Sequence, residues 1–226
     1  IVRAIDDESK KHKNTLTSKE RYLIADHLRA IVFAISDGVI PSNEGRGYVV
    51  KRLITDVTDI ILEKNKESFV HKLVPAVVVA MKDPYEDLVN KQRNISSWVQ
   101  KTEEAYQKVR QQRIPEIKEE AKKVKNINEL GEILFKFKDT YGLSSASAYT
   151  SLMSIPSEQL SRSLNIRNQR EWEEKVLHGT KIAEQKMDQQ REKSRAASKM
   201  TGDVFTTSEI NLDDMTKTEF VGYDQN

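Results

Sequence analysis

Apolar residues along most of this chain recur every three or four positions, with polar residues between them. That spacing places the apolar side chains on one face of an α-helix. Glycine and proline, which interrupt helices, number only 8 and 5 among 226 residues, so few breaks are expected. The pattern therefore predicts a mostly α fold.

The first clearly marked helix follows Thr17. Residues 17–20 are TSKE, a capping box in which the Thr17 hydroxyl and the Glu20 carboxylate each satisfy a free backbone N–H group. The helix is predicted to reach about Ile35. Its expected buried residues are Leu23, Ile24, Leu28, Ile31, Val32 and Ile35.

Turn-forming residues interrupt the helical pattern after Ile35. Asp37-Gly38 and residues 41–47, PSNEGRG, predict an exposed loop or a short hairpin near 37–50. The helical spacing resumes at Tyr48. Later helices are predicted over 69–81, 85–112, 116–125, 128–141 and 169–200, with a Ser- and Ala-rich turn after 142 and a small strand-like segment from Gly202.

Proline and composition suggest where the chain divides. Pro84 and Pro115 are placed at helix ends, because the residue before a proline avoids the helical conformation. The predicted divisions are 1–86, 87–200 and 201–226, the last as a linker.

Charge and composition narrow the classes of protein. Lys and Arg number 37 against 35 Asp and Glu, so RNA binding would need a local basic patch rather than a strongly basic chain. No apolar run approaches the ~20 residues of a membrane span, and Ile1–Lys13 is too polar for a signal peptide. The absence of cysteine excludes disulfides and thiolate metal sites and fits the cytosol.

Several segments, in one order along the chain, resemble a single family. They are IADHLRA at 24–30, SDGVIPSNEGRGYVVKR at 36–52, FKDTYG at 137–142, MDQQREKSR at 187–195 and TEFVGYD at 218–224. In this order and with these gaps, the segments resemble alanyl-tRNA synthetase over roughly residues 15 to 224.

The resemblance implies an interior piece of that enzyme, between its class II catalytic core and its editing domain, where the tRNA acceptor stem is gripped. The family's three class II motifs are not found in this chain, nor are the zinc-binding His and Cys residues of the editing domain. The resemblance therefore implies no catalytic or metal-binding residue here. ATP and Mg²⁺ would belong to the catalytic core and zinc to the editing domain, and this chain alone should not attach alanine to tRNA(Ala).

The same resemblance implies the partners. These are the acceptor stem of tRNA(Ala) and the remaining domains of the same synthetase, with no membrane. A monomer is expected, because the family dimerises through a C-terminal domain. The expected location is the cytoplasm, although organellar synthetases share these motifs.

Family members recognise a G·U wobble pair with the Asn of a PSN motif and the Asp of DTYG, which correspond to Asn43 and Asp139. A carboxylate only accepts hydrogen bonds and suits the guanine 2-amino group, whereas an Asn amide can donate to the uracil carbonyl. Without the resemblance, Asn43 would be read as a turn former and Asp139 as a cap before Tyr141-Gly142.

Three cations flank the predicted loop: Arg46, Lys51 and Arg52, which are expected to contact phosphates. The family commonly continues as RRIIRRA, whereas this chain has Thr55 and Asp56 at two of the basic positions. That departure, with the near-neutral net charge, motivates a competing hypothesis. The chain would then be a helical RNA- or protein-interaction module derived from this region, without synthetase activity.

Other polar residues have simpler explanations. Asp26 and Arg29 are spaced to form an ion pair on one helix face, with His27 on another face. Ser42 has no base beside it in sequence, so covalent catalysis is not expected. Trp98 and Trp172 are interpreted as anchors of buried helix seams.

Overall fold

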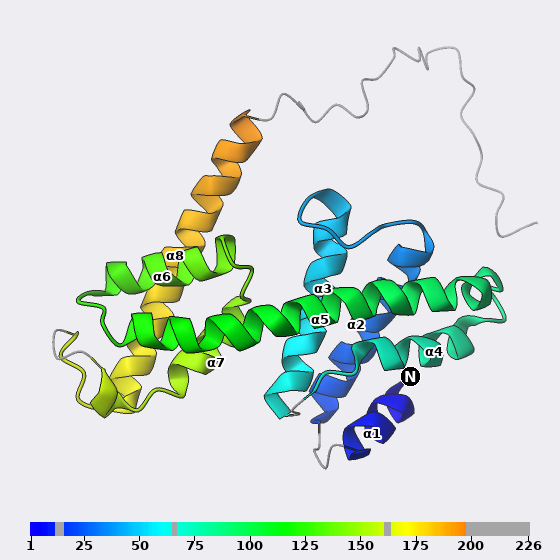
Figure 1. Ribbon diagram of the computed structural model, residues 1–226, viewed down its shortest axis with the longest axis horizontal. Helices are drawn as coiled ribbons and strands as arrows, with labels where there is room; N and C mark the ends of the chain where they lie inside the picture. The colour runs from blue at the N-terminus through cyan, green and yellow to red at the C-terminus, as the bar shows by residue number, and fades with distance from the viewer. Residues whose placement is uncertain (12–15, 65–66, 161–163, 198–226) are drawn as a thin grey trace, which may run out of the picture. The chain divides into compact units, whose positions relative to one another are not determined.

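The computed structural model describes residues 1–11, 16–64, 67–160 and 164–197 (Figure 1). Every regular element in these ranges is a helix, which confirms the mostly α prediction. The elements are α1 (Val2–Lys11), α2 (Ser18–Ser36), α3 (Gly45–Lys64), α4 (Val70–Met81), α5 (Asp87–Ala121), α6 (Ile127–Asp139), α7 (Ser145–Met153), the 3₁₀ turn η1 (Ser157–Gln159) and α8 (Gln169–Ala197).

Two of the sequence predictions fall partly or wholly outside this description. The strand-like segment from Gly202 and the linker 201–226 lie outside the described residues. Residues Ile1–Met187 form one compact unit, and the contacts described below lie within it.

Helix α2 begins as its sequence predicts. The Thr17 hydroxyl accepts from the Glu20 N–H at 3.2 Å, and the Thr17 N–H donates to the Glu20 carboxylate at 2.7 Å, so the capping box is complete. The buried residues of α2 are Ile24, Leu28, Ile31, Val32 and Ile35. The predicted burial of Leu23 is wrong, because its side chain flanks this stripe and is 39% exposed.

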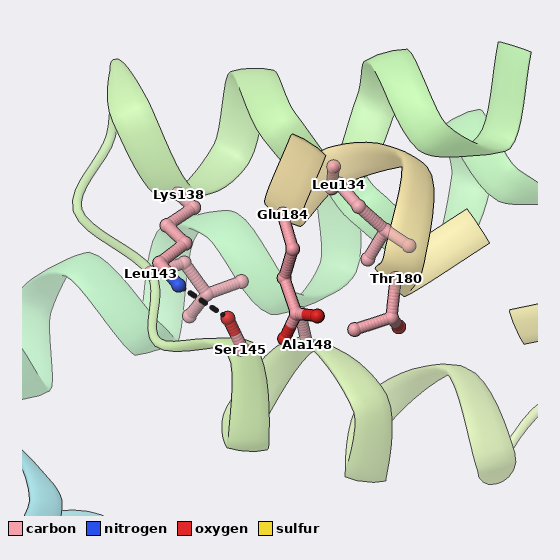
Figure 2. Close-up of a pocket in the computed structure, with 8 residues that line it drawn as sticks. Leu134, Lys138, Leu143, Ser145, Ala148, Thr180 and Glu184 are labelled. Carbon is pink, nitrogen blue, oxygen red and sulfur yellow. Dashed lines mark hydrogen bonds between the residues drawn. The ribbon is translucent and has the colours of Figure 1, made fainter. Parts of the chain in front are cut away.

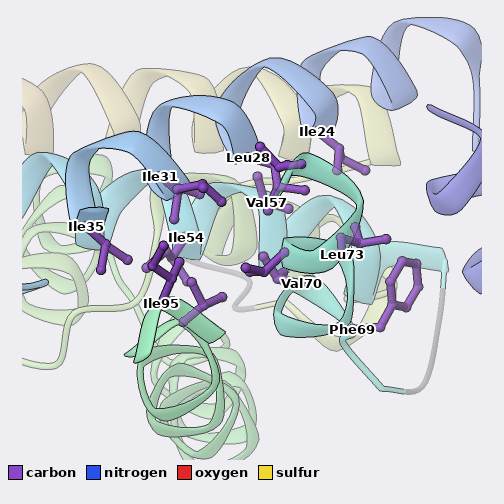
Figure 3. Packing of buried hydrophobic residues seen from close by; sticks show 14 of the residues in the cluster. Ile24, Leu28, Ile31, Ile35, Ile54, Val57, Phe69, Val70, Leu73 and Ile95 are labelled. Carbon is purple, nitrogen blue, oxygen red and sulfur yellow. The ribbon is translucent and has the colours of Figure 1, made fainter. Parts of the chain in front are cut away.

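The first apolar core joins α2, α3, α4 and the N-terminal half of α5. Figure 3 shows side chains from these helices converging. Among them are Ile24, Leu28, Ile31, Ile54, Val57, Phe69, Val70, Leu73 and Ile95. The burial of these apolar side chains stabilises the packing of α3 against its neighbours. The loop that precedes α3 is therefore held in place as well.

Helix α5 is continuous, and the predicted break at Pro115 is wrong. Pro115 lies on the exposed side of the helix, where water can solvate the carbonyl that loses its N–H partner. Beyond the proline, Ile117 and Ala121 are buried in the second apolar core, which holds the last turns in place. Since Leu88 and Ile95 belong to the first core, α5 contributes to both.

The second core is built by the end of α5 together with α6, α7 and α8. Its members include Leu130, Leu134, Phe137, Leu143, Leu152, Trp172 and Val176. Trp172 is fully buried and its indole N–H donates to the Leu152 carbonyl at 2.8 Å, as expected for a seam anchor. Helix α7 was predicted as a turn, but Ser144 caps it by accepting from the Ser147 N–H at 3.0 Å.

Candidate nucleic-acid interface

Residues 37–44 form a loop, and α3 begins at Gly45, three residues earlier than predicted. The range 37–50 contains no strand, so the hairpin alternative is wrong and the loop alternative is confirmed. The Ser42 N–H donates to the Gly47 carbonyl at 3.1 Å, and the Ser42 hydroxyl donates to the Glu44 carbonyl at 3.0 Å. The loop is therefore folded back onto the first turn of α3.

This fold of the loop requires glycine at position 47. A Cβ atom there would lie 2.2 Å from the Ser42 hydroxyl oxygen and 2.3 Å from the Ile40 carbonyl oxygen. Gly45 has a φ of +56°, in the left-handed region that favours glycine. The two glycines of the NEGRG segment therefore set the course of the backbone next to Asn43.

Asn43 is exposed at the end of this loop, and its side-chain oxygen accepts from the Lys51 ammonium group at 2.6 Å. A lysine only donates hydrogen bonds, so the oxygen of the amide must face it. Within the described residues no protein group accepts from the Asn43 amide N–H groups. Asn43 is therefore held with its donor side available.

The three predicted phosphate-binding cations differ in their surroundings. Arg46 is exposed and has no carboxylate partner in the described part of the chain. Lys51 contacts Asn43, and the Arg52 guanidinium lies 3.7 Å from the Asp56 carboxylate one helical turn later. Arg46 thus presents an unpaired positive charge, whereas Asp56 partly neutralises Arg52.

Position 55, basic in the family pattern, lies on the core side of α3. Thr55 is buried, and its hydroxyl donates to the Arg52 carbonyl at 2.9 Å. A cation at this position of the present structure would lose most of its contact with water. Of the two departures from the basic pattern, only Asp56 changes the charge of the accessible surface.

Asp139 is the last residue of α6 and is exposed. Its carboxylate makes no hydrogen bond or ion pair with any residue that the structure describes. A negative charge is unfavourable at the C-terminus of a helix, where the backbone carbonyls already carry partial negative charge. Helix stability therefore does not account for a carboxylate at this position.

The turn after Asp139 is fixed by several contacts. The Leu143 N–H donates to the Phe137 carbonyl at 3.0 Å, and Gly142 adopts a left-handed φ of +72°. The Tyr141 ring lies 4.0 Å from the Arg113 guanidinium and packs edge-on against Phe137, with 5.2 Å between ring centres. The DTYG segment is consequently an ordered turn.

A buried polar network, which we call the Asp59 network, lies where α3, α5 and α7 meet. The Asp59 carboxylate accepts from the Tyr106 hydroxyl at 3.0 Å and from the Ser147 hydroxyl at 2.7 Å. The Arg110 guanidinium and the Ser144 hydroxyl also donate to it. The Ser144 N–H in turn donates to the Tyr106 hydroxyl at 3.2 Å. The network therefore ties α3 to the start of α7, directly after the DTYG turn.

The pKa values of Tyr106 and Asp56 are raised by their surroundings. Burial raises the pKa of Tyr106 to about 12, and the negative charge of Asp59 adds to the rise, so the phenol keeps its proton at neutral pH. Burial also raises the pKa of the Asp56 carboxyl, and the charge of Asp59 acts in the same direction, while Arg52, His27 and Lys138 act against it.

The sequence-predicted residues thus fall into two groups. Asn43 lies on the loop, and Arg46, Lys51 and Arg52 lie on the first turns of α3. Asp139 lies at the end of α6. In the view of Figure 1, the loop before α3 and the C-terminal end of α6 both lie above α5. Sequence reasoning missed the Asp59 network, although a carboxylate on the apolar face of α3 was a signal that could have found it.

A small pocket lies beside Lys138, between α6, α7 and α8. The Lys138 ammonium group donates a hydrogen bond to the Ser145 hydroxyl, with 2.9 Å between nitrogen and oxygen. Figure 2 shows this bond with Glu184 of α8 near it. The rest of its lining comes from Leu134, Leu143, Ala148, Thr180 and Ala183. The pocket therefore lies beside the turn that joins α6 to α7.

One further expectation concerns a pair of charged side chains on α2. Arg29 and Asp26 form the predicted ion pair, with 3.0 Å between nitrogen and oxygen. In the described ranges, no group of three or more His, Cys, Asp or Glu side chains is arranged to hold a metal ion. None of the helices described here is both long enough and apolar enough to cross a membrane.

The sequence of this chain matches a known protein family. A family model described as tRNA synthetases class II (A) matches residues 1–154, which include both Asn43 and Asp139. The chain belongs to this family. It is also homologous to alanyl-tRNA synthetase, as its curated relatives show.

Among these class II relatives, the alanine–tRNA ligase of Haemophilus influenzae (strain PittGG) is 41% identical over 128 residues, covering 56% of this chain and 15% of the ligase. The alanine–tRNA ligase of Legionella pneumophila (strain Lens) is 32% identical over 208 residues, covering 90% of this chain and 21% of the ligase. That of Psychrobacter sp. (strain PRwf-1) is 34% identical over 212 residues, covering 90% and 20%. The chain therefore spans about a fifth of these relatives, or less.

Proposed function

We propose that this chain is the region of an alanyl-tRNA synthetase that recognises the tRNA(Ala) acceptor stem through its G·U wobble pair. The observation that carries the proposal is the contact between Lys51 and the Asn43 side-chain oxygen, which leaves the amide N–H groups of Asn43 free to donate. The relatives, which are named alanine–tRNA ligases, are consistent with it.

In this proposal Asn43 donates a hydrogen bond to the uracil carbonyl, which a wobble pair displaces into the major groove. The A-form major groove is too narrow for side chains in the middle of a helix, but it opens near a helix end, where an acceptor stem terminates. Asn43 lies on an exposed loop at the start of α3, and such a loop can enter a groove end more easily than a flat helix face.

Asp139 accepts from the 2-amino group of guanine, which the wobble geometry leaves without its usual partner in the minor groove. Its carboxylate is exposed and makes no bond to any other described residue, so both oxygens are available. The unfavourable position of this charge at the end of α6 is understandable if the charge serves RNA recognition rather than folding.

Arg46, Lys51 and Arg52 supply positive charge next to the loop and are assigned to phosphate contacts. Arg46 has no carboxylate partner among the described residues and should contribute most, whereas Asp56 weakens the contribution of Arg52. These contacts fix the position of the stem, and the two base contacts supply the specificity.

The remaining chemistry belongs to other parts of the proposed parent enzyme. Its catalytic core would use ATP and Mg²⁺ to attach alanine, and its editing domain would hold zinc. This chain would lie between them, contribute recognition in the cytoplasm during protein synthesis, and have no aminoacylation activity by itself.

The test is fluorescence anisotropy with a labelled acceptor-stem hairpin carrying the G·U pair and its G·C counterpart, each at several salt concentrations. The proteins are the wild type, Asn43→Ala and Asp139→Ala. Asn94→Ala and Asp83→Ala serve as matched controls, since each removes an exposed side chain of the same kind elsewhere.

The wild type and both controls are expected to prefer the G·U hairpin, and each site variant is expected to lose about five- to hundredfold of that preference. Equal, weak and salt-labile binding of the wild type to both hairpins would contradict the proposal and favour a general interaction module.

A further inference from the structure

The Asp59 network is the polar junction between the two apolar cores. Along α5, Ile95 and Val99 belong to the first core and Ile117 to the second, and Tyr106 and Arg110 lie between them. Here the packing is directional, because hydrogen bonds and an ion pair replace apolar contact. Such bonds fix the rotation and register of α3 against α7, which apolar side chains tolerate more loosely.

We infer that Asp59, Tyr106, Ser144 and Ser147 are positioning residues that set the spacing between the base-reading side chains Asn43 and Asp139. The inference rests on the proposed function. The two base-reading side chains form no hydrogen bond with each other within the described residues, so their spacing is determined by the elements that carry them.

The first connection runs through α3. Asp59 and Lys51 are eight residues apart on one continuous helix, which is about 12 Å along its axis. Lys51 holds the Asn43 side chain directly, and the loop is folded onto the same end of α3 by the Ser42–Gly47 bond. The position of Asp59 therefore fixes the position of Asn43.

The second connection runs through the DTYG turn. Ser144 donates both its N–H, to Tyr106, and its hydroxyl, to Asp59. Its neighbour Leu143 is buried and donates to the carbonyl of Phe137, two residues before Asp139. The chain between Ser144 and Asp139 is thus held at both ends, and the network also fixes the position of Asp139.

Specific recognition of one base pair needs this accuracy. Two side chains that contact two bases of the same pair must be held within about 0.5 Å of their productive positions by the groups behind them. Asn43 and Asp139 lie on separate elements, so one shared anchor is the simplest way to hold both. The Asp59 network is such an anchor, because it bonds both elements.

The test uses the whole 226-residue chain and two mild variants, Tyr106→Phe and Ser147→Ala, each of which removes one hydroxyl from the network. Glu103→Gln is the matched control. Glu103 is a buried carboxylate on the same helix, but it accepts from the Val70 N–H at 2.8 Å and the His71 N–H at 3.2 Å, away from the DTYG turn. Melting temperatures establish that each variant is folded at the assay temperature.

Two quantities are measured. The first is the ratio of the Kd values for the G·C and G·U hairpins. The second is a distance distribution between spin labels attached after Glu44→Cys and Thr140→Cys, two exposed positions next to the base-reading residues. Because the chain has no cysteine of its own, the labels attach only at these positions. This distance needs no RNA.

In Tyr106→Phe and Ser147→Ala the distance distribution is expected to broaden or shift, and the Kd ratio is expected to fall at least about fivefold, with both unchanged in Glu103→Gln. An unaltered ratio or an unaltered distribution in both network variants would overturn the inference and leave the proposed function standing. Equal Kd values for the two hairpins in the wild type would overturn the proposed function. The role of the network in specificity would fall with it, even if the distance distribution still depends on the network.

Discussion

The ammonium group of Lys51 lies 2.6 Å from the side-chain oxygen of Asn43, so a helix residue orients the side chain of a loop residue. This contact gives Lys51 two effects in the proposed function. It adds positive charge near the phosphates, and it determines which side of the Asn43 amide faces the RNA.

Lys51→Met is therefore expected to weaken binding to the G·U hairpin more than binding to the G·C hairpin. Arg46→Met, which removes a charge without touching Asn43, is expected to weaken both equally and to reduce the salt dependence by about one unit of slope. Titrations of both variants against both hairpins over a range of salt decide this. Equal losses in the two variants would mean that Lys51 acts only through its charge.

Asp139→Asn is expected to separate stability from recognition. Removing the negative charge from the C-terminus of α6 should raise the free energy of unfolding, by about 1 kcal/mol at most. The same change replaces a carboxylate, which only accepts hydrogen bonds, with an amide that both donates and accepts. It should reduce the G·U preference about fivefold or more. Urea unfolding and hairpin binding, measured on one preparation, check both halves. A destabilised Asp139→Asn would show that the carboxylate has a structural partner.

Gly47→Ala is expected to displace the loop, since the added Cβ would meet the Ser42 hydroxyl and the Ile40 carbonyl. Asn43 would then lose its place, and the preference for G·U should fall, while the helical circular dichroism stays near that of the wild type. Val49→Ala, an exposed position on the same part of α3, is the control and should change neither. Retained preference in Gly47→Ala would show that the loop conformation is not needed.

Asp56→Asn is expected to raise stability at neutral pH. Burial, assisted by Asp59, raises the folded-state pKa of this carboxyl, so the folded protein holds its proton more tightly than the unfolded chain. Stability therefore falls as the pH rises from the unfolded to the folded pKa, and the loss persists at neutral pH. Melting temperatures should differ between variant and wild type at pH 7 and converge below about pH 4.

The same substitution should strengthen binding to both hairpins. Asp56→Asn removes the partner of Arg52 and leaves that guanidinium free for phosphate, so the salt dependence should increase by up to about one unit of slope. The ratio of the two Kd values should not change. Asp83→Asn, an exposed carboxylate elsewhere, is the control for the change in net charge. Unchanged binding would place Arg52 away from the RNA.

The helices and most of the first core could be predicted from the sequence, because a buried stripe repeats at the helical period. Thr17 and Glu20 marked the start of α2 correctly, since capping depends on neighbouring residues alone. Pro115 led to a wrong prediction of a helix break. The helical hydrogen bond that the proline removes is compensated by exposure to water and by the packing of the residues beyond it. Helix α7 was missed because its Ser and Ala residues give little periodic signal, and its start depends on the Ser144 cap.

The candidate base-reading residues came from the resemblance, and their exposure agrees with that interpretation without testing it. What the sequence could not show is how the two residues are held. The Asp59 network joins positions 47 and 85 residues apart, namely Tyr106 and Ser144 with Asp59. Such pairings form only when α3, α5 and α7 pack together, so the local sequence pattern does not predict them.

The most direct test of the central claim replaces guanine by inosine in the G·U hairpin, which removes only the 2-amino group. The wild type is expected to bind the inosine hairpin at least about fivefold more weakly than the guanine hairpin, and Asp139→Ala is expected to bind the two equally. If the wild type binds both hairpins with the same Kd, Asp139 does not recognise the guanine amino group and the account of wobble-pair recognition is wrong.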